Sequence, residues 1–150
     1  MPETHVHLRV HLVWSTRHRR PWLDPEWRVR LFAVASGAAE RCRARLICAG
    51  GVRDHVHLYV ELPPTRTLAE LVNALKAGTA RWIQESFPHR AGFAWQHGYA
   101  AFSVAQDEEN RLLDYIRHQE VSHRERDFTG EYLSLLEHHG IAYDLRDVLD

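Results

Sequence analysis

The sequence predicts an α+β fold, in which helices pack on an antiparallel sheet. Residues 5–14 and 55–62 alternate strictly between hydrophobic and polar side chains, which is typical of strands with one buried face. Residues 25–43 and 68–87 carry hydrophobic side chains at helical spacing. The predicted order is strand, helix, strand, strand, helix, strand, helix. This order favours four to five antiparallel strands with two helices on the apolar face of the sheet.

Local signals justify the elements of the first half. The first strand leads into a basic loop at residues 15–22, and Asp24-Pro25 is a typical helix cap and first helical residue. Residues 45–52 form a second strand that ends in glycines. Because only a short gap separates it from the strand at 55–62, we expect the two to pair as a hairpin.

The second half begins with a capping box, in which Thr67 and Glu70 start the second helix. Residues 93–105 are the fourth strand region. The run Asp107-Glu108-Glu109 predicts the start of a third helix, since acids suit the positive helix end. We predict one domain over residues 1–126. Residues 127–150 are expected to be a tail of the same domain, with a short helix from Tyr132 to His138.

Composition excludes several classes of protein. The chain has 150 residues, of which 45% are hydrophobic and 26% charged, an ordinary balance for one globular domain. It has no apolar run near the ~20 residues that a membrane helix needs, and its start does not resemble a signal peptide. Cys42 and Cys48 make neither a disulfide framework nor a metal clip. We therefore expect a soluble protein of the cytoplasm with no membrane partner.

Charge is distributed unevenly along the chain. The net charge of −1 argues against a nucleic-acid binder. Residues 1–66, however, hold 11 arginines against six acids, and residues 67–150 hold eight basic residues against 14 acids. All basic residues except Lys76 are arginine, the better bidentate phosphate ligand. A near-neutral protein can therefore present a basic face.

A histidine pair is the first candidate site. His55 and His57 lie two residues apart and so share one face of the predicted strand, while Val56 between them faces the core. Two imidazoles at this spacing can bind one divalent ion, although an HxH pair alone is a weak signal. Asp54 either caps the adjacent turn, which we prefer, or orients an imidazole.

The third helix supplies the second part of the candidate site. Tyr115 and Gln119 are four residues apart and therefore share a helix face. They lie beside the hydrophobic stripe of Leu112, Leu113 and Ile116, so the helix can dock its apolar side while both polar groups face a cleft. Without the histidine pair, we would interpret them as a half-buried tyrosine and a surface glutamine.

Five segments in order resemble a known family, the HUH-superfamily transposases with a single catalytic tyrosine. The segments are HLVWSTRHRRP (11–21), GGVRDHVHLYVELP (50–63), GYAAFSVA (98–105), YIRHQEVSHR (115–124) and HHGIAYDLR (138–146). This family comprises the small transposases of insertion sequences of the 200/605 type and their REP-associated relatives. The resemblance covers nearly the whole chain. It implies a ferredoxin-like or RRM-like HUH fold, with the tyrosine-bearing helix near the histidine face.

The resemblance also implies residue roles. His55 and His57 take the place of the two metal-binding histidines, Tyr115 that of the catalytic tyrosine and Gln119 that of the third metal ligand. His118 stands where relatives often have asparagine, and it could compete for the metal. Imidazole and amide ligands with open positions suit Mg²⁺ or Mn²⁺.

The activity implied is cutting and rejoining of single-stranded DNA with hairpin or palindromic ends. A tyrosine hydroxyl attacks the phosphodiester, and the resulting 5′-phosphotyrosine keeps the bond energy for rejoining. Relatives of the insertion-sequence kind work as homodimers, whereas some REP-associated relatives are monomers. Two alternatives remain: a domesticated, inactive protein that binds DNA hairpins, and a histidine-dependent small phosphoesterase, since HVHL occurs at 5–8 and at 55–58.

Further residues are assigned to the neighbourhood of the site or to DNA. His11 lies on the first strand and lines the predicted site. The basic loop has the composition of a phosphate-contacting segment, although a solvated loop fits it equally well. The candidate DNA contacts are Arg17, Arg19, Arg20, Lys76 and Arg81.

Overall fold

The computed structural model describes residues 3–119 and 127–148. In this part of the chain, a four-stranded antiparallel sheet has the order β2-β3-β1-β4. The strands are β1 (Arg9–Ser15), β2 (Arg45–Gly51), β3 (His55–Glu61) and β4 (Ala100–Ser103). The helices are α1 (Pro25–Arg41), α2 (Leu68–Ser86), α3 (Glu109–Arg117), α5 (Phe128–His138) and α6 (Leu145–Val148). Short 3-10 turns lie at η1 (Arg17–Arg19), η2 (Pro88–Arg90) and η3 (Gln106–Glu108). The predicted α+β class is confirmed.

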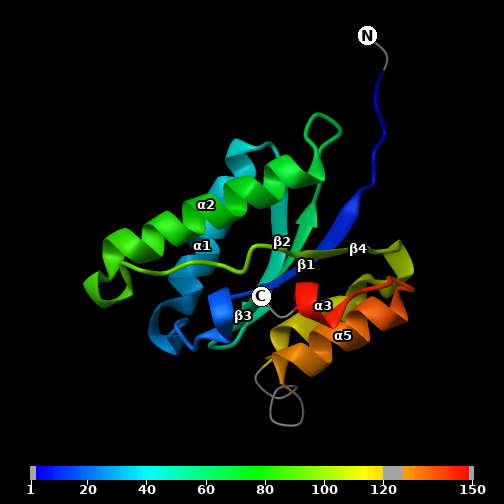
Figure 1. The fold of residues 1–150 in the computed structure, drawn as a ribbon. Helices are drawn as coiled ribbons and strands as arrows, with labels where there is room; N and C mark the ends of the chain where they lie inside the picture. The colour runs from blue at the N-terminus through cyan, green and yellow to red at the C-terminus, as the bar shows by residue number, and fades with distance from the viewer. Residues whose placement is uncertain (1–2, 120–126, 149–150) are drawn as a thin grey trace.

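Helices α1 and α2 pack together on one side of the sheet, and α3 and α5 lie on the other (Figure 1). The α1–α2 side holds the larger core, which strands and helices build from alternate residues. Its fully buried members include Leu12, Leu58, Val60, Leu31, Leu71, Leu75 and Ile83. The predicted placement of two helices on the apolar face is therefore confirmed.

A second, smaller core lies on the opposite face of the sheet. Val13 of β1 and Phe102 of β4 pack there against Phe128, Tyr132 and Leu136 of α5. Spacings of four along α5 give this helix one apolar stripe. The helix begins four residues earlier than predicted, because the Asp127 side chain accepts a hydrogen bond from the amide of Gly130, at 2.9 Å, and caps it.

Two strands are shorter than their sequence patterns predict. β1 starts at Arg9, which pairs with Glu61, the last residue of β3. Residues 3–8 are exposed. The carbonyl of Leu8 still accepts from the amide of Leu62 at 2.8 Å, but Pro63-Pro64 follows and stops the ladder there. In the region 93–105 only β4 is a strand, apart from an isolated bridge between Thr16 and Trp95.

The helix starts follow the sequence signals in part. Thr67 caps α2 as predicted, with its hydroxyl accepting from the amide of Glu70 at 3.1 Å. Asp24 occupies the cap position of α1, but its carboxylate makes no capping bond and instead accepts from Trp27, Arg53 and Arg90. Within residues 3–119 and 127–148, no helix combines the length and apolarity that crossing a bilayer requires.

Candidate active site

The two histidines lie on β3, in the hairpin that this strand forms with β2. His55 and His57 begin β3 and project from the sheet face that α3 and α5 cover, and both are fully buried. Val56 between them packs in the larger core on the other face. The period of two along β3 thus holds the imidazoles side by side, with their ring centroids 5.2 Å apart.

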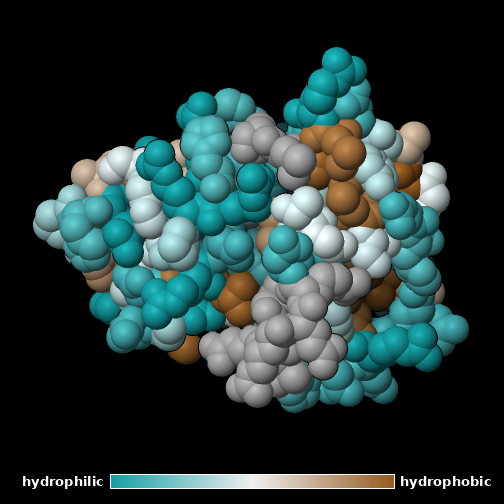
Figure 2. Space-filling model, turned by 60° about the horizontal axis from the view of Figure 1, so that its bottom comes forward, coloured by the Kyte–Doolittle hydropathy of each residue, from teal (hydrophilic) through white to brown (hydrophobic). Residues whose placement is uncertain are grey.

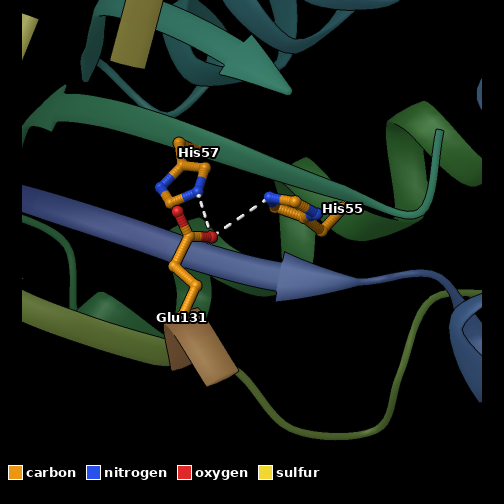
Figure 3. A group of neighbouring side chains, drawn as sticks. All are labelled: His55, His57 and Glu131. Carbon is orange, nitrogen blue, oxygen red and sulfur yellow. Dashed lines mark hydrogen bonds and ion pairs between the residues drawn. The ribbon is translucent and has the colours of Figure 1, made fainter. Parts of the chain in front are cut away.

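A carboxylate from α5 meets both imidazoles. Oε1 of Glu131 lies 3.0 Å from Nε2 of His57 and 3.2 Å from Nε2 of His55. Figure 3 shows the Glu131 side chain pointing toward both rings. Glu131 is itself fully buried. A buried carboxylate is stable only when charged or hydrogen-bonded partners offset its lost hydration, so the two imidazoles account for its burial. We call His55, His57 and Glu131 the His–Glu cluster.

The Nδ1 atoms of His55 and His57, which point away from Glu131, each contact a further side chain. Oδ1 of Asp54 lies 2.8 Å from Nδ1 of His55, and Nε2 of His11 lies 2.8 Å from Nδ1 of His57. These contacts fix both rings so that their Nε2 atoms face Glu131. For Asp54 the preferred expectation of a turn cap is wrong. Its carboxylate binds the imidazole, while its backbone carbonyl accepts from Thr16.

Helix α3 contributes the tyrosine and the glutamine. The hydroxyl of Tyr115 donates a hydrogen bond to Oε2 of Glu131. Oε1 of Gln119 lies 3.1 Å from Nε2 of His55, and its amide nitrogen donates to the carbonyl of Tyr115. Helix α3 ends at Arg117, yet both side chains still reach the cluster. Residues 120–124 of the matching motif lie outside the described residues.

A polar network ties the start of α3 to the sheet. Nη1 of Arg9 donates to Oε1 of Glu109 at 2.6 Å, and the Tyr59 hydroxyl donates to the same oxygen at 2.8 Å. The Tyr59 side chain lies on the histidine face of β3 and is nearly fully buried. The network therefore anchors the helix that carries Tyr115 to both central strands.

The pKa values of His55 and His11 shift in opposite directions. Burial by itself lowers the pKa of His55, but hydrogen bonds to the carboxylates of Asp54 and Glu131 outweigh it and raise that pKa to about 9. Burial holds the pKa of His11 well below its usual value, and the neighbouring His57 lowers it further. His11 is therefore a neutral partner for His57.

The donor set fits a divalent cation. The ligand atoms of His55, His57 and Glu131 lie within 4.8 Å of one another, and Oε1 of Gln119 lies beside them. Two imidazole nitrogens with carboxylate and amide oxygens suit Mg²⁺ or Mn²⁺ better than a soft thiophilic ion. The contact of His55 with the Asp54 carboxylate is of the kind that metal-binding histidines usually make.

Other residues singled out in the sequence lie farther from the cluster. His118 is exposed, and its Nδ1 donates to the carbonyl of Asp114. Lys76 donates to the carbonyls of Gln96 and Gly98, at 2.8 and 2.7 Å, and so supports the chain before β4. Arg81 is exposed on α2.

The basic loop lies at the surface, at the end of β1. Arg17 and Arg20 are exposed and line a hollow of about 280 Å³ with Trp22, while Arg19 is half-buried. His18 and Arg19 both have a φ of 56°, a left-handed conformation that non-glycine residues adopt at a cost of about 1–3 kcal/mol. Such strain is common where a loop contacts a ligand.

The profile of a family described as "Transposase IS200 like" matches residues 4–119, which is more than half of the chain. The chain belongs to the IS200-like transposase family. Transposases of this kind cut and rejoin DNA, and the HUH fold predicted from the resemblance is confirmed by the structural neighbours.

Individual relatives agree with this assignment. The chain is 26% identical over 140 residues to the transposase for insertion sequence element IS200 of Salmonella typhimurium, covering 90% of this chain and 89% of the relative. It is also 26% identical over 117 residues to the ISDra2 transposase TnpA of Deinococcus radiodurans, covering 75% of this chain and 84% of the relative.

Two solved structures are similar in fold. One is a crystal structure assigned as a transposase of Deinococcus radiodurans R1, with a TM-score of 0.64 and 25% identity, covering 77% of this chain and 94% of that one. The other is a REP-associated tyrosine transposase bound to a REP hairpin, with a TM-score of 0.59 and 16% identity, covering 82% of this chain and 74% of that one.

Glu131 is the site residue that sequence reasoning missed. It lies in the segment 127–150, which we expected to be a tail. One signal was available: Phe128, Tyr132 and Leu136 form an apolar stripe at helical spacing, and Glu131 lies next to it. An acid beside the buried stripe of a helix indicates that its carboxylate has a buried polar partner, but the sequence pattern does not identify that partner.

Proposed function

We propose that this IS200-like transposase cuts single-stranded DNA with Tyr115 as the nucleophile, at a divalent cation bound by His55, His57 and Gln119. One observation carries the proposal. The Tyr115 hydroxyl and both imidazole Nε2 atoms converge on the two oxygens of a single buried carboxylate, Glu131. Nucleophile and cation ligands therefore lie within reach of the same phosphodiester.

A side chain of this protein is placed to accept the proton of the nucleophile. Oε2 of Glu131 accepts the hydrogen bond of the Tyr115 hydroxyl and is placed to take its proton as the oxygen attacks phosphorus. The bond between phosphorus and the 3′-oxygen breaks, and that oxygen takes up a proton from water and leaves as a 3′-hydroxyl. The product is a 5′-phosphotyrosine, which the 3′-hydroxyl of another strand can attack.

The cation site is built from His55, His57 and Gln119, with Glu131 as a fourth side chain in contact. When bound, Mg²⁺ or Mn²⁺ would polarise a nonbridging phosphate oxygen and stabilise the charge that develops on it. The roles of the residues around it follow from their contacts: Asp54 and His11 fix the orientation of the two imidazoles.

The substrate we propose is single-stranded DNA with hairpin or palindromic ends. A similar fold, that of the REP-associated transposase, is bound to a REP hairpin, which supports this choice. The exposed arginines of the basic loop, Arg17 and Arg20, together with Arg19, are the proposed phosphate contacts. We propose that Lys76 and Arg81 on α2 also contact the DNA.

We further expect a homodimer, which light scattering of the purified protein would detect.

Helix α5 covers the cluster in this structure. His55, His57, Gln119 and Glu131 are all buried, whereas Tyr115 is half-buried. Contact between a phosphodiester and the imidazoles therefore requires the side chains that cover the rings to shift, because both rings are fully buried.

The test uses a hairpin oligonucleotide with single-stranded flanks, incubated with the protein and Mn²⁺. The wild-type protein is expected to form a covalent adduct that survives denaturing electrophoresis. Tyr115→Phe is expected to form none. The matched control is Tyr143→Phe, because the Tyr143 hydroxyl is exposed and contacts only Glu137 among the described residues. An adduct with Tyr115→Phe would refute the assignment of the nucleophile.

The two alternative functions predict different outcomes. A hairpin binder without catalysis would bind the oligonucleotide and form no adduct. The phosphoesterase hypothesis requires the two HVHL segments to form one site. His5 and His7 are exposed, whereas His55 and His57 are buried, so the hypothesis finds no support.

A further inference from the structure

A pocket opens beside Tyr115 on the side of the molecule that carries α3 and α5. It has a volume of about 310 Å³ and lies among β4, α3 and α5. Its walls include Tyr115 and Arg111 of α3, Phe102 of β4, and His138 and His139 at the end of α5. Figure 2, in which the lower side of Figure 1 comes forward, shows apolar residues at the surface among mostly hydrophilic ones.

We propose that this tyrosine pocket binds one unpaired nucleotide of the DNA strand, next to the phosphate that Tyr115 attacks. The proposal rests on the function proposed above, since it takes Tyr115 as the nucleophile. Continuity is the first argument. Tyr115 belongs both to the pocket wall and to the hydrogen-bonded cluster, so a nucleotide in the pocket would have its phosphate within a few bonds of the tyrosine hydroxyl.

The second argument is a stacking platform. The rings of Phe102 and His139 are stacked, with centroids 4.2 Å apart and planes 22° from parallel. Nδ1 of His139 donates to the carbonyl of Leu135 at 2.9 Å, so the imidazole is held in place although it is exposed. Preformed aromatic surfaces of this kind bind unpaired bases, because every base has a π-face.

Charge supplies the third argument. Arg111 is exposed at the pocket and makes no hydrogen bond or ion pair with residues 3–119 or 127–148. His138 lies in the same lining and is also exposed. Glu108 is the acid in the lining, and its carboxylate already accepts from the amide of Ala105 at 3.3 Å. An unpaired guanidinium beside an aromatic platform matches a phosphate flanked by a base.

Size decides between a single nucleotide and a duplex. The volume lies at the lower end of ligand pockets, which span about 300–1,000 Å³. That space accommodates one base with its sugar. A duplex is far wider, so only a strand whose base is splayed out can enter, as in enzymes that act on unstacked nucleotides.

The experiment first finds the cut site. A stem-loop oligonucleotide with randomised flanks is incubated with the protein and Mn²⁺, and the DNA attached to the protein is sequenced. We expect a base preference at one nucleotide adjacent to the cut. His139→Ala and Arg111→Gln should each reduce that preference by about 5- to 10-fold, whereas His139→Phe, which keeps the platform, should retain it. His89→Ala is the matched control, since His89 is exposed on η2 and outside the pocket lining.

A binding measurement separates stacking from catalysis. In the Tyr115→Phe background, the selected oligonucleotide is compared with one that has an abasic site at the preferred nucleotide. The abasic change should weaken binding by about 10-fold, and it should have no further effect once His139 is alanine. Equal sensitivity in both proteins would overturn the pocket proposal. Adducts without any base preference would overturn it while leaving the proposed function intact, and the absence of adducts would overturn both.

Discussion

The backbone carbonyl of Ile116 lies directly against Gly50. A Cβ atom built on Gly50 would overlap this oxygen, and it would lie 2.9 Å from Cγ2 of Ile116. Gly50 is on β2 and Ile116 is one residue after Tyr115 on α3. Because glycine has no side chain, α3 can approach the sheet closely enough for Tyr115 to reach Glu131.

Gly50→Ala is therefore expected to push α3 from the sheet and to abolish adduct formation. The clash is with backbone, which cannot rotate away, so we also expect a loss of about 1–3 kcal/mol in the free energy of unfolding. Urea unfolding and the adduct assay measure the two effects. The control is Gly37→Ala within α1, where the nearest atom lies at 3.6 Å. That change should leave adduct formation intact and stabilise the helix by about 0.5–1 kcal/mol.

The network of Arg9, Tyr59 and Glu109 predicts a coupled effect on stability. The Arg9 and Glu109 side chains are 15% and 22% exposed, so their ion pair is only partly screened. Glu109→Ala should cost about 1–3 kcal/mol and also slow adduct formation, because the start of α3 loses its anchor. A double-mutant cycle with Arg9→Ala should give a coupling of at least about 0.5 kcal/mol. Simple additivity of the two changes would show that the ion pair does not hold α3.

Asp54 is predicted to support the cation site through His55. Asp54→Asn weakens the hold on Nδ1 of His55 while leaving the backbone carbonyl of residue 54 free to accept from Thr16. We expect Mn²⁺ affinity to fall by about 10- to 100-fold, with little change in the far-ultraviolet circular dichroism. Titration of free Mn²⁺ by electron paramagnetic resonance gives the affinity. Unchanged affinity would leave Asp54 with a purely structural role.

Glu131→Gln tests whether the carboxylate belongs to the cation site. In the wild-type protein Mn²⁺ should raise the melting temperature, since a ligand that binds only the folded state stabilises it. The variant keeps the shape of the side chain but loses its charge, so we expect a smaller rise. EDTA should cancel the rise in both proteins. Glu137→Gln, on the exposed side of the same helix, should behave like the wild type.

The raised pKa of His55 predicts how stability depends on pH in the presence of EDTA. His55 has a pKa of about 9 when folded and an ordinary value of 6.5, because Asp54 and Glu131 outweigh the effect of burial. Its contribution is fully present below pH 6.5, where folded and unfolded chains are both protonated at this residue. Above that pH only the folded chain keeps the proton, so stability falls until about pH 9.

Urea unfolding across this pH range measures the slope. The double variant Asp54→Asn, Glu131→Gln removes both carboxylates that raise the pKa of His55. Its free energy of unfolding should therefore lose the decline above pH 6.5. A wild-type curve that rises over the same interval would contradict the assigned protonation of His55.

Much of the fold follows from local patterns. The alternation in residues 55–62 predicts that His55 and His57 face away from the core, and the spacing of Tyr115 and Gln119 predicts that they act together; the structure places all four side chains at one cluster. Strand ends were less predictable. Residues 5–8 alternate as well as residues 9–14 do, but the register of β1 with β3 begins only at Arg9, and beyond it Leu8 alone bonds across, to Leu62.

The sequence by itself determined which faces carry the histidines and the tyrosine, because the periods of strands and helices are local properties. Only the tertiary structure decided that Glu131 joins them. Its partner His57 is 74 residues earlier in the chain. The contact arises because Phe128, Tyr132 and Leu136 dock α5 across the sheet. The side chains that drive this docking are apolar and non-directional, so the hydrophobic pattern shows that α5 is buried but not which polar residues it brings together.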